Sequence, residues 1–431
     1  MKIGVVSLGC CKNLVDSERM MGLLRQSGHE IVHNVHEAEA IIVNTCGFIE
    51  PAKEEAINTI LEMAEYKNEN CRKLIVAGCL AQRYKADLQA EMPEVDYFLT
   101  ISEYPKMGQI LTQVLGEKVL DGYGKNTRLV STKPWTAYLK IAEGCDKHCT
   151  YCIIPKLRGN YRSVPMEKLL AEAKDLADQG VKELILVAQE TTVYGKDLYG
   201  EKSLHKLLRE LCKISGIQWI RILYCYPEEI YDELIQTIKE ENKVCHYLDL
   251  PIQHASDAVL KRMGRRTSKA QLVEIIEKLR KEIPDISLRT TLITGFPGET
   301  QEQHEELKDF VDEMEFDRLG VFTYSPEEDT PAATMTEQIP EEVKEDRQAE
   351  LMELQQEIAF DLAEDMVGRE VLVMIEGKVA DENAYVGRTY KDAPNVDGLI
   401  FINTDEELMS GDFARVRVTG ALEYDLIGEL I

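Results

Sequence analysis

The chain has 431 residues, of which 44% are hydrophobic and 29% are charged, and its formal net charge at pH 7 is −27. This length predicts two or three domains, and the composition is that of a globular protein. A strongly acidic surface repels nucleic-acid phosphates and favours basic partners, so the charge argues against a nucleic-acid-binding function.

Eleven cysteines, an odd number, fit thiols and metal ligands better than a disulfide framework. No apolar run approaches the roughly 20 residues that cross a bilayer, so no membrane partner is expected. The opening residues 1–10 (MKIGVVSLGC) end as a lipoprotein signal does, but their apolar stretch is too short for one. We therefore expect a first strand here and a cytoplasmic protein.

Residues 1–120 alternate between short β-branched runs and helix-like segments. The expected strands are 3–8, 40–44 and 73–77, and each is followed by an expected helix at 14–26, 51–66 or 80–91. Fully apolar strands that alternate with helices are typical of a buried parallel sheet. This pattern predicts a doubly wound α/β domain.

Three cysteines come one to two residues after these three strands, and each has a glycine beside it. They are Cys10, Cys46 and Cys79. Loops after parallel strands share one edge of a sheet, so the three thiols can converge on one metal cluster. The alternative is that each is a small buried thiol, which is the commoner fate of a single cysteine.

A polar, turn-rich segment at 121–134 is the expected linker to a second α/β series, which spans residues 131–361. Its expected strands are 137–142, 184–188, 220–224, 247–251, 288–293 and 318–324. Its expected helices are 165–179, 203–214, 228–241, 268–283 and 300–315. Six βα repeats predict a partial (β/α)6 barrel rather than a closed barrel of eight strands.

After Pro340 we expect an amphipathic helix, and residues 364–431 then change to short strands. The expected strands are 370–375, 384–389, 399–402 and 413–419, which predict a small OB-like β-barrel. From residue 365 to the end there are six Lys or Arg and fourteen Asp or Glu, a net charge of −8. A small β-barrel that binds RNA is usually basic.

The strongest motif is a C-x3-C-x2-C run formed by Cys145, Cys149 and Cys152, directly after the first expected barrel strand. Thiolates are the natural ligands of iron–sulfur clusters, and a four-iron cubane usually takes four of them. A cluster held by three keeps one iron open, as catalytic metal sites do. Its place at the carboxyl end of a strand is where barrel active sites lie.

With the amino-terminal cysteines and the domain order, this motif resembles the radical S-adenosylmethionine (SAM) methylthiotransferases over essentially the whole chain. The resemblance implies an amino-terminal cluster domain, a radical SAM barrel and a terminal TRAM domain. It also implies two [4Fe-4S] clusters, on Cys10, Cys46 and Cys79 and on Cys145, Cys149 and Cys152, with SAM bound at the open iron of the second set.

Further SAM-binding residues are carried over from the resemblance. The turn 294–299 (TGFPGE) resembles a SAM-contacting loop, which implies contacts from Gly295, Gly298 and Glu299. Gln189 and Glu190 follow the second barrel strand, although an aspartate is common at the second position. Tyr151 is placed like the aromatic residue beside the adenine. Each could instead be an ordinary turn or packing residue.

Three runs resemble the RimO-type branch, which acts on a ribosomal protein: 154–163 (IPKLRGNYRS), 188–192 (AQETT) and 250–257 (LPIQHASD). The resemblance implies β-methylthiolation of an aspartate in small-subunit ribosomal protein twelve, together with a low-potential electron donor and a sulfur donor. The acidic carboxyl-terminal domain suits a basic protein substrate. A transfer-RNA adenosine methylthiotransferase is the alternative, and an iron–sulfur carrier without catalysis is a third hypothesis.

Several assignments stay open at this stage. Cys11 could replace Cys10 as a ligand, although Cys10 holds the family's position. Lys156, Arg158 and Arg162 could bind a substrate carboxylate or form a solvated or ion-paired surface. His254 could be a core histidine or a substrate contact. The remaining cysteines are expected to be buried thiols: Cys71, Cys212, Cys225 and Cys245.

Overall fold

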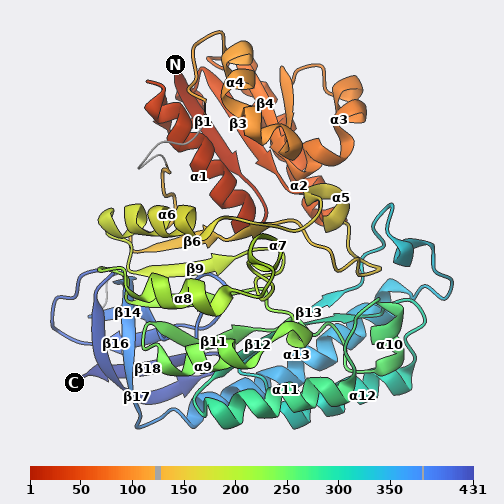
Figure 1. Ribbon diagram of the computed structural model, residues 1–431, viewed down its shortest axis with the longest axis vertical. Coiled ribbons are helices and arrows are strands. Elements are labelled where there is room, and N and C mark those ends of the chain that lie inside the picture. The colour runs from red at the N-terminus through yellow and green to blue at the C-terminus, as the bar shows by residue number, and fades with distance from the viewer. Residues whose placement is uncertain (122–127, 381–382) are drawn as a thin grey trace. The chain divides into compact units, whose positions relative to one another are not determined.

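The computed structural model describes residues 1–121, 128–380 and 383–431 (Figure 1). Contacts divide the chain into two compact units. The first unit comprises Met1–Gln179, Val187–Gln189 and Ser325–Ala333. The second unit comprises Gly180–Leu186, Glu190–Tyr324 and Thr334–Ile431.

The first unit contains a five-stranded parallel sheet with the order β2-β1-β3-β4-β5. Its strands are β1 (Lys2–Ser7), β2 (Glu30–Val32), β3 (Ala40–Thr45), β4 (Lys73–Gly78) and β5 (Tyr97–Thr100). In the central register Val5 lies opposite Ile42, and Val43 lies opposite Val76. The three predicted strands are present as the centre of this sheet.

Helices cover both faces of the sheet, which confirms the doubly wound prediction (Figure 1). The helices are α1 (Cys11–Gln26), α2 (Glu50–Glu65), α3 (Cys79–Glu91) and α4 (Met107–Leu115), with short 3₁₀ turns η1 (Val35–Glu37), η2 (Tyr66–Asn68) and η3 (Ile101–Lys106). On one face α1 and α4 pack through Met20 and Leu111 against Ile42. On the other face α2 packs through Ile60 against Val43.

The first unit continues through the cysteine loop. Its further elements are β6 (Thr136–Lys140), β7 (Ala142–Glu143), α5 (Ile154–Arg158), β8 (Arg162–Ser163) and α6 (Met166–Asp178). The linker at 121–134 stays a prediction. Residues 122–127 lie outside the described residues, but Arg128 is buried and its guanidinium donates hydrogen bonds to Glu18, Glu172 and the carbonyl of Tyr138.

Five parallel strands with the order β13-β12-β11-β10-β9 form the sheet of the second unit. They are β9 (Glu183–Val187), β10 (Trp219–Ile222), β11 (Val244–Asp249), β12 (Ser287–Thr294) and β13 (Arg318–Thr323). The connecting helices are α7 (Lys196–Tyr199), α8 (Leu204–Cys212), α9 (Asp232–Glu240), α10 (Asp257–Arg262), α11 (Lys269–Glu282) and α12 (Gln301–Met314), with turn η4 (Pro227–Glu229). Turn η5 (Pro331–Thr334) belongs mostly to the first unit. Together with β6, the six strands predicted for the partial barrel are all present.

Helix α13 (Glu341–Glu364) follows Pro340 and leads into a closed five-stranded barrel with the order β14-β15-β16-β18-β17. Its strands are β14 (Glu370–Lys378), β15 (Ala384–Arg388), β16 (Ile400–Asn403), β17 (Phe413–Leu422) and β18 (Asp425–Leu430). Val373, Ile402 and Val416 lie in its core. The predicted small β-barrel is confirmed, and its closing strand β18 is the one that the sequence pattern missed.

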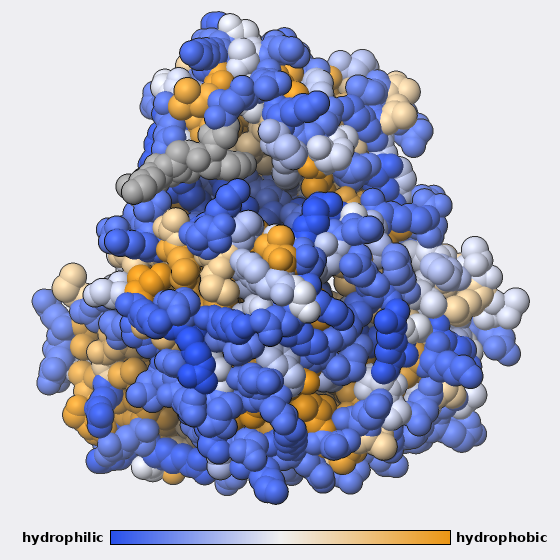
Figure 2. All heavy atoms as spheres, viewed as in Figure 1, coloured by the Kyte–Doolittle hydropathy of each residue, from blue (hydrophilic) through white to orange (hydrophobic). Residues whose placement is uncertain are grey.

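Hydrophilic residues dominate the face of the molecule in Figure 2, in line with the net charge of −27. Exposed apolar side chains on the carboxyl-terminal barrel include Leu372, Met409 and Leu422. Across the described ranges, the structure has no helix with the length and apolar character needed to span a bilayer.

Candidate functional site

The C-x3-C-x2-C loop is held at its base by a two-stranded ribbon in the first unit. Strands β7 and β8 pair antiparallel, with Ala142 opposite Ser163 and Glu143 opposite Arg162. Within the loop the backbone N–H of Cys145 donates to the carbonyl of Gly159 at 3.1 Å. The three cysteines therefore lie on a short segment whose two ends are fixed.

Gln189, predicted as a SAM contact, anchors this loop. Its side-chain oxygen accepts a hydrogen bond from the buried backbone N–H of Gly144 at 2.9 Å. Its amide nitrogen donates to a carboxylate oxygen of Glu143 at 3.1 Å. Gln189 follows the last residue of β9, Val187, whose carbonyl accepts from the N–H of Ile141. The residues at the carboxyl end of β9 thus fix the cysteine loop, which follows β7.

The thiols of the loop are close enough to influence one another. Cys145 and Cys149 are each 5% exposed. Burial, together with the negative charges of the Cys149 and Cys145 thiolates, raises the pKa of Cys152 to about 12. With this pKa the Cys152 thiol keeps its proton at neutral pH, and a bound iron would remove it, because coordination deprotonates thiol ligands. Tyr151 lies half-buried inside the same loop.

Cys10, Cys46 and Cys79 all follow strands at the carboxyl edge of the first unit's sheet. Strands β1 and β3 are neighbours whose connections run to opposite faces, and this is where doubly wound sheets bind ligands. Cys46 follows β3 directly, and Cys79 follows β4 directly. Gly9 has a φ of 82°, and a Cβ there would lie 2.7 Å from the Cβ of Cys46. Only glycine allows the two loops this close.

The three thiols of this set also act on one another electrostatically. Burial tends to raise the pKa of Cys10, but the charges of Lys12 and Arg158 outweigh it and hold that pKa below its usual value. Burial and the charge of Cys10 raise the pKa of Cys46. Burial raises the pKa of Cys79 to about 11. Cys10 is therefore the thiol of the set that is most ready to act as a thiolate, and its choice over Cys11 as a ligand stays a prediction.

A buried polar cluster behind these cysteines was missed from the sequence. Asn13 donates from its side-chain nitrogen to the carbonyls of Leu8 at 3.1 Å and Thr45 at 2.8 Å, so it joins the ends of β1 and β3. Arg158, only 3% exposed, donates to Asn13 and to a carboxylate oxygen of Asp16 at 2.9 Å. The signal in the sequence was a run of polar residues directly after Cys10, at positions that an α-helix turns inward.

Both sets have the donor chemistry of an iron–sulfur site. All six are free cysteines, and thiolates are the ligands that such clusters use. In the described part of the chain, no group of three or more His, Cys, Asp or Glu side chains surrounds a point that could hold a single metal ion.

In the second unit the predicted glycine-rich turn is packed against the chain itself. Gly295 has a φ of 69°, and a Cβ there would lie 2.2 Å from the Cγ of Lys344. The N–H of Gly298 donates to the carbonyl of Glu337 at 2.9 Å. Glu299 closes the turn, because its carboxylate accepts from the N–H of Phe296 at 3.0 Å. Assignment of this turn to SAM stays a prediction.

Glu299 and Glu190 are both buried carboxylates of the second unit, at 3% and 1% exposure. Burial raises the pKa of Glu299 although the guanidinium of Arg347 opposes this, and Arg347 donates to it at 3.0 Å. Glu190 accepts a hydrogen bond from the backbone N–H of Thr192 at 3.0 Å. Both side chains therefore brace the loops in which they lie.

His254 is a buried histidine that fixes the backbone after β11. Its Nδ1 accepts hydrogen bonds from the N–H groups of Ala255 at 3.0 Å and Ser256 at 2.9 Å. Its Nε2 lies 3.9 Å from Glu299. Burial and the charges of His304, Arg262 and Arg347 lower the pKa of His254 to about 3. Of the two alternatives, the structure supports the core histidine.

The three cations after the cysteine loop have different environments. Arg158 is buried and ion-paired, so it does not belong to a solvated surface. Lys156 is exposed and donates to the carbonyl of Asp329 at 2.9 Å. Arg162 is exposed and donates to the carbonyl of Arg158 at 3.3 Å. Lys156 also lies 3.7 Å from a carboxylate oxygen of Asp329, so it belongs to an ion-paired surface.

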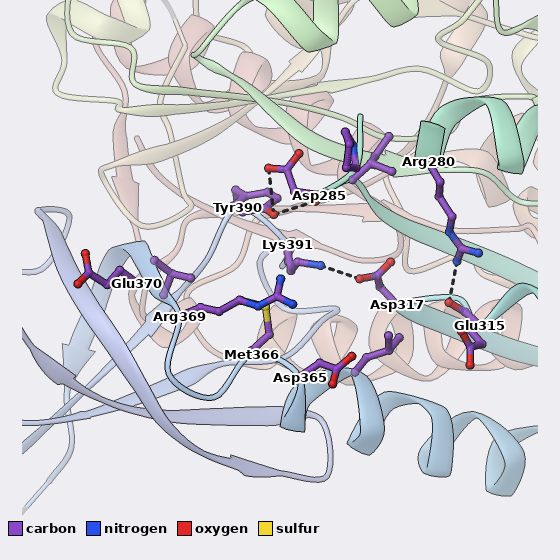
Figure 3. A pocket seen from close by; sticks show the side chains of 14 residues that line it. Arg280, Asp285, Glu315, Asp317, Asp365, Met366, Arg369, Glu370, Tyr390 and Lys391 are labelled. Atoms are coloured by element: carbon purple, nitrogen blue, oxygen red, sulfur yellow. Dashed lines mark hydrogen bonds and ion pairs between the residues drawn. The ribbon is translucent and has the colours of Figure 1, made fainter. Parts of the chain in front are cut away.

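A cavity of about 470 Å³ lies elsewhere in the second unit, at the amino-terminal ends of β12 and β13 (Figure 3). Two of its polar side chains are already paired: Lys391 donates to Asp317 at 2.8 Å, and the Tyr390 hydroxyl donates to the carbonyl of Asp285 at 2.8 Å. Because barrel chemistry lies at the opposite, carboxyl-terminal ends of the strands, this cavity is not the candidate active site.

Comparison with family models divides the chain into three matched regions. Residues 2–100 match the uncharacterized protein family UPF0004, residues 139–311 match the radical SAM superfamily, and residues 367–431 match the TRAM domain.

Similar proteins cover the whole chain. A protein from Lachnoclostridium phytofermentans named ribosomal protein uS12 methylthiotransferase RimO is 63% identical, over 99% of this chain and 99% of its own. One of the same name from Clostridium perfringens is 54% identical, over 99% and 97%. Among solved structures, the radical SAM methyltransferase TsrM from Kitasatospora setae has a TM-score of 0.58 at 13% identity, over 88% of this chain and 81% of that one. This last likeness concerns the fold alone.

Proposed function

Because the chain belongs to the RimO family of ribosomal protein uS12 methylthiotransferases, we propose that it attaches a methylthio group to ribosomal protein uS12. The reaction replaces one hydrogen on the β-carbon of an aspartate by S–CH₃, and it consumes two SAM molecules. One SAM supplies the methyl group and the other supplies the radical. The observation that carries this proposal is the 63% identity over 99% of both chains.

We assign Cys145, Cys149 and Cys152 to one [4Fe-4S] cluster and Cys10, Cys46 and Cys79 to the other. When bound, the first cluster supplies an open iron for SAM and the electron that cleaves it to methionine and a 5′-deoxyadenosyl radical, while the second supplies an open iron for sulfur. The protein's part is to hold the thiols and to exclude other reactants.

The residues around the cysteine loop position it for this chemistry. Gln189 fixes the backbone at Gly144 and the carboxylate of Glu143, so Cys145 begins from an anchored residue. Tyr151, Glu190, Gly295, Gly298 and Glu299 are proposed to line the SAM site together with Gln189. The side chain of Lys344 leaves no room for a Cβ at Gly295, so the glycine-rich turn requires glycine there.

The acidic carboxyl-terminal domain is proposed to attract the basic ribosomal protein, since opposite charges speed encounter and select partners. The reaction also requires a low-potential electron donor and a sulfur donor. A ribosomal substrate implies a cytoplasmic enzyme. We propose that the domains run over 1–120, 131–361 and 364–431.

The test is anaerobic incubation of the reconstituted enzyme with SAM, sulfide and a strong reductant, in parallel with uS12 and with transfer RNA. Mass spectrometry of both products follows. The proposal predicts uS12 heavier by a methylthio group less one hydrogen, with the addition on an aspartate. Addition to transfer RNA alone would contradict it, and absence of 5′-deoxyadenosine in every reaction would favour an iron–sulfur carrier.

A further inference from the structure

Arg158 places its guanidinium against the sulfur of Cys79. Its Nη2 lies 3.4 Å from the Cys79 Sγ in hydrogen-bonding geometry, and the arginine side chain is 1% exposed. Cys79 is 5% exposed, whereas Cys10 and Cys46 are partly exposed. The guanidinium thus meets the most deeply buried sulfur of the amino-terminal set.

The two ends of the guanidinium have different partners. Nη1 donates to Asp16 at 2.9 Å and to both carboxylate oxygens of Glu143 at 3.3 Å. Nη2 donates to the side-chain oxygen of Asn13 and to Cys79. An arginine that served only to neutralise the two carboxylates would need the first end alone, so the second end has a separate task.

The charges of the buried side chains around Arg158 also indicate that its contact with Cys79 has a separate role. Asp16 and Glu143 also bind the ammonium group of Lys140, whose Nζ lies 2.8 Å from Glu143. Two carboxylates therefore face two cations, and each charge is compensated without the sulfur. The charges of these four side chains therefore balance without the N–H···S contact, so neutralisation does not explain it.

We propose that Arg158 is a positioning residue that hydrogen-bonds the Cys79 thiolate and raises the reduction potential of the amino-terminal cluster. The inference rests on the proposed assignment of Cys10, Cys46 and Cys79 as cluster ligands. Hydrogen bonds and positive charge at the sulfurs stabilise the more negative, reduced state of an iron–sulfur cluster. The same arginine contacts Glu143, two residues before Cys145, so the cation also joins the loops that carry the two sets.

The test isolates the amino-terminal cluster in the full-length chain by the triple change Cys145→Ala, Cys149→Ala and Cys152→Ala. Iron content of this parent is measured first, and its midpoint potential is then determined by redox titration followed by electron paramagnetic resonance. When Arg158→Met is added to this parent, the ratio of oxidised to reduced iron–sulfur cluster at a fixed potential should rise about tenfold. For a one-electron couple this is a midpoint potential about 59 mV lower.

Two further variants keep the test decisive if Arg158→Met folds poorly. Arg158→Gln combined with Asp16→Asn removes one charge of each sign, so the net charge of the buried side chains does not change while the contact to Cys79 does. We again expect a lower midpoint potential of the iron–sulfur cluster. Arg162→Met removes a neighbouring exposed arginine that donates to a backbone carbonyl, and it should leave the potential unchanged.

The outcomes separate the two claims. A parent without iron overturns the ligand assignment and the inference with it. A parent with a cluster whose potential and spectrum are the same in the Arg158 variants overturns the inference alone. A downward shift in both Arg158 variants, absent in Arg162→Met, supports it.

Discussion

The side-chain oxygen of Gln189 accepts a hydrogen bond at 2.9 Å from the buried N–H of Gly144, the residue directly before Cys145. One side chain thereby fixes where the cysteine loop begins. Its amide nitrogen extends the contact to Glu143, which in turn binds Arg158. A hydrogen-bonded path therefore runs from the loop of one cysteine set to the sulfur of Cys79 in the other.

The first prediction concerns Gln189→Leu. Leucine cannot accept from the Gly144 N–H, and an unsatisfied buried donor costs about 1–3 kcal/mol. The free energy of unfolding should fall by about this amount in urea titrations, and the reconstituted variant should retain less iron than wild type. Gln236→Leu, which removes an exposed helical glutamine, should change neither quantity. Equal loss in both variants would argue against an anchoring role.

The second prediction concerns pH. The pKa of His254 in the folded protein is about 3, whereas that of an unfolded histidine is about 6.5. The unfolded chain therefore binds a proton in this window that the folded protein does not, so His254 lowers stability as pH falls below about 6.5. Between pH 7 and pH 5 its contribution is a loss of about 2 kcal/mol.

His254→Asn is the matched variant for this effect, because the asparagine oxygen can accept from the N–H groups of Ala255 and Ser256 without titrating. Its unfolding free energy should fall less steeply with acidification than that of wild type. Glu299, with its raised pKa, and His304, with its lowered pKa, are present in both proteins and cancel in the comparison. Parallel stability curves for the two proteins would refute the assignment.

The third prediction concerns a buried ion network in the second unit. Glu183 is fully buried between Arg221 at 2.9 Å and Arg388 at 2.6 Å. Arg388→Met leaves the buried carboxylates of Glu183 and Glu376 with one cation fewer, and breaking a buried pair costs about 3–5 kcal/mol. Urea unfolding measures this loss.

Arg417→Met is the control for that variant. Arg417 also lies on a strand of the carboxyl-terminal barrel and pairs with Glu370 at 3.1 Å, but both side chains are about half exposed. Exposed pairs contribute about 0–1 kcal/mol, so this variant should unfold almost as wild type does. A loss in Arg388→Met no greater than in the control would show that the network is not important for stability.

Strand and helix positions could be predicted where hydrophobic periodicity was long and regular. Strands β3 and β4 and helix α12 are examples, because each carries an unbroken apolar pattern. Strand β2 was missed because it has three residues and none of them is buried. Strand β18 was missed because its sequence, DLIGEL, mixes acidic residues and glycine with the apolar positions that close the barrel.

The cysteines of the site were predictable for a different reason. Cys145, Cys149 and Cys152 are close together in the sequence, which predicts one shared site. Cys10, Cys46 and Cys79 each follow a parallel strand, which predicts that they lie at one edge of the sheet. Arg158 shows the limit of such reasoning. In sequence it belongs to a basic run, but its partners Asp16 and Cys79 are 142 and 79 positions away. Only the fold reveals which of the three neighbouring cations turns inward.

The most direct test of two three-cysteine clusters is iron quantitation per chain after anaerobic reconstitution. The wild type is compared with Cys10→Ala/Cys46→Ala/Cys79→Ala and with Cys145→Ala/Cys149→Ala/Cys152→Ala. Cys212→Ser, outside both sets, is the control and should keep all of its iron. Each triple variant should lose about half of the wild-type iron, since each set holds one cubane. Wild-type iron content in either triple variant would contradict the account.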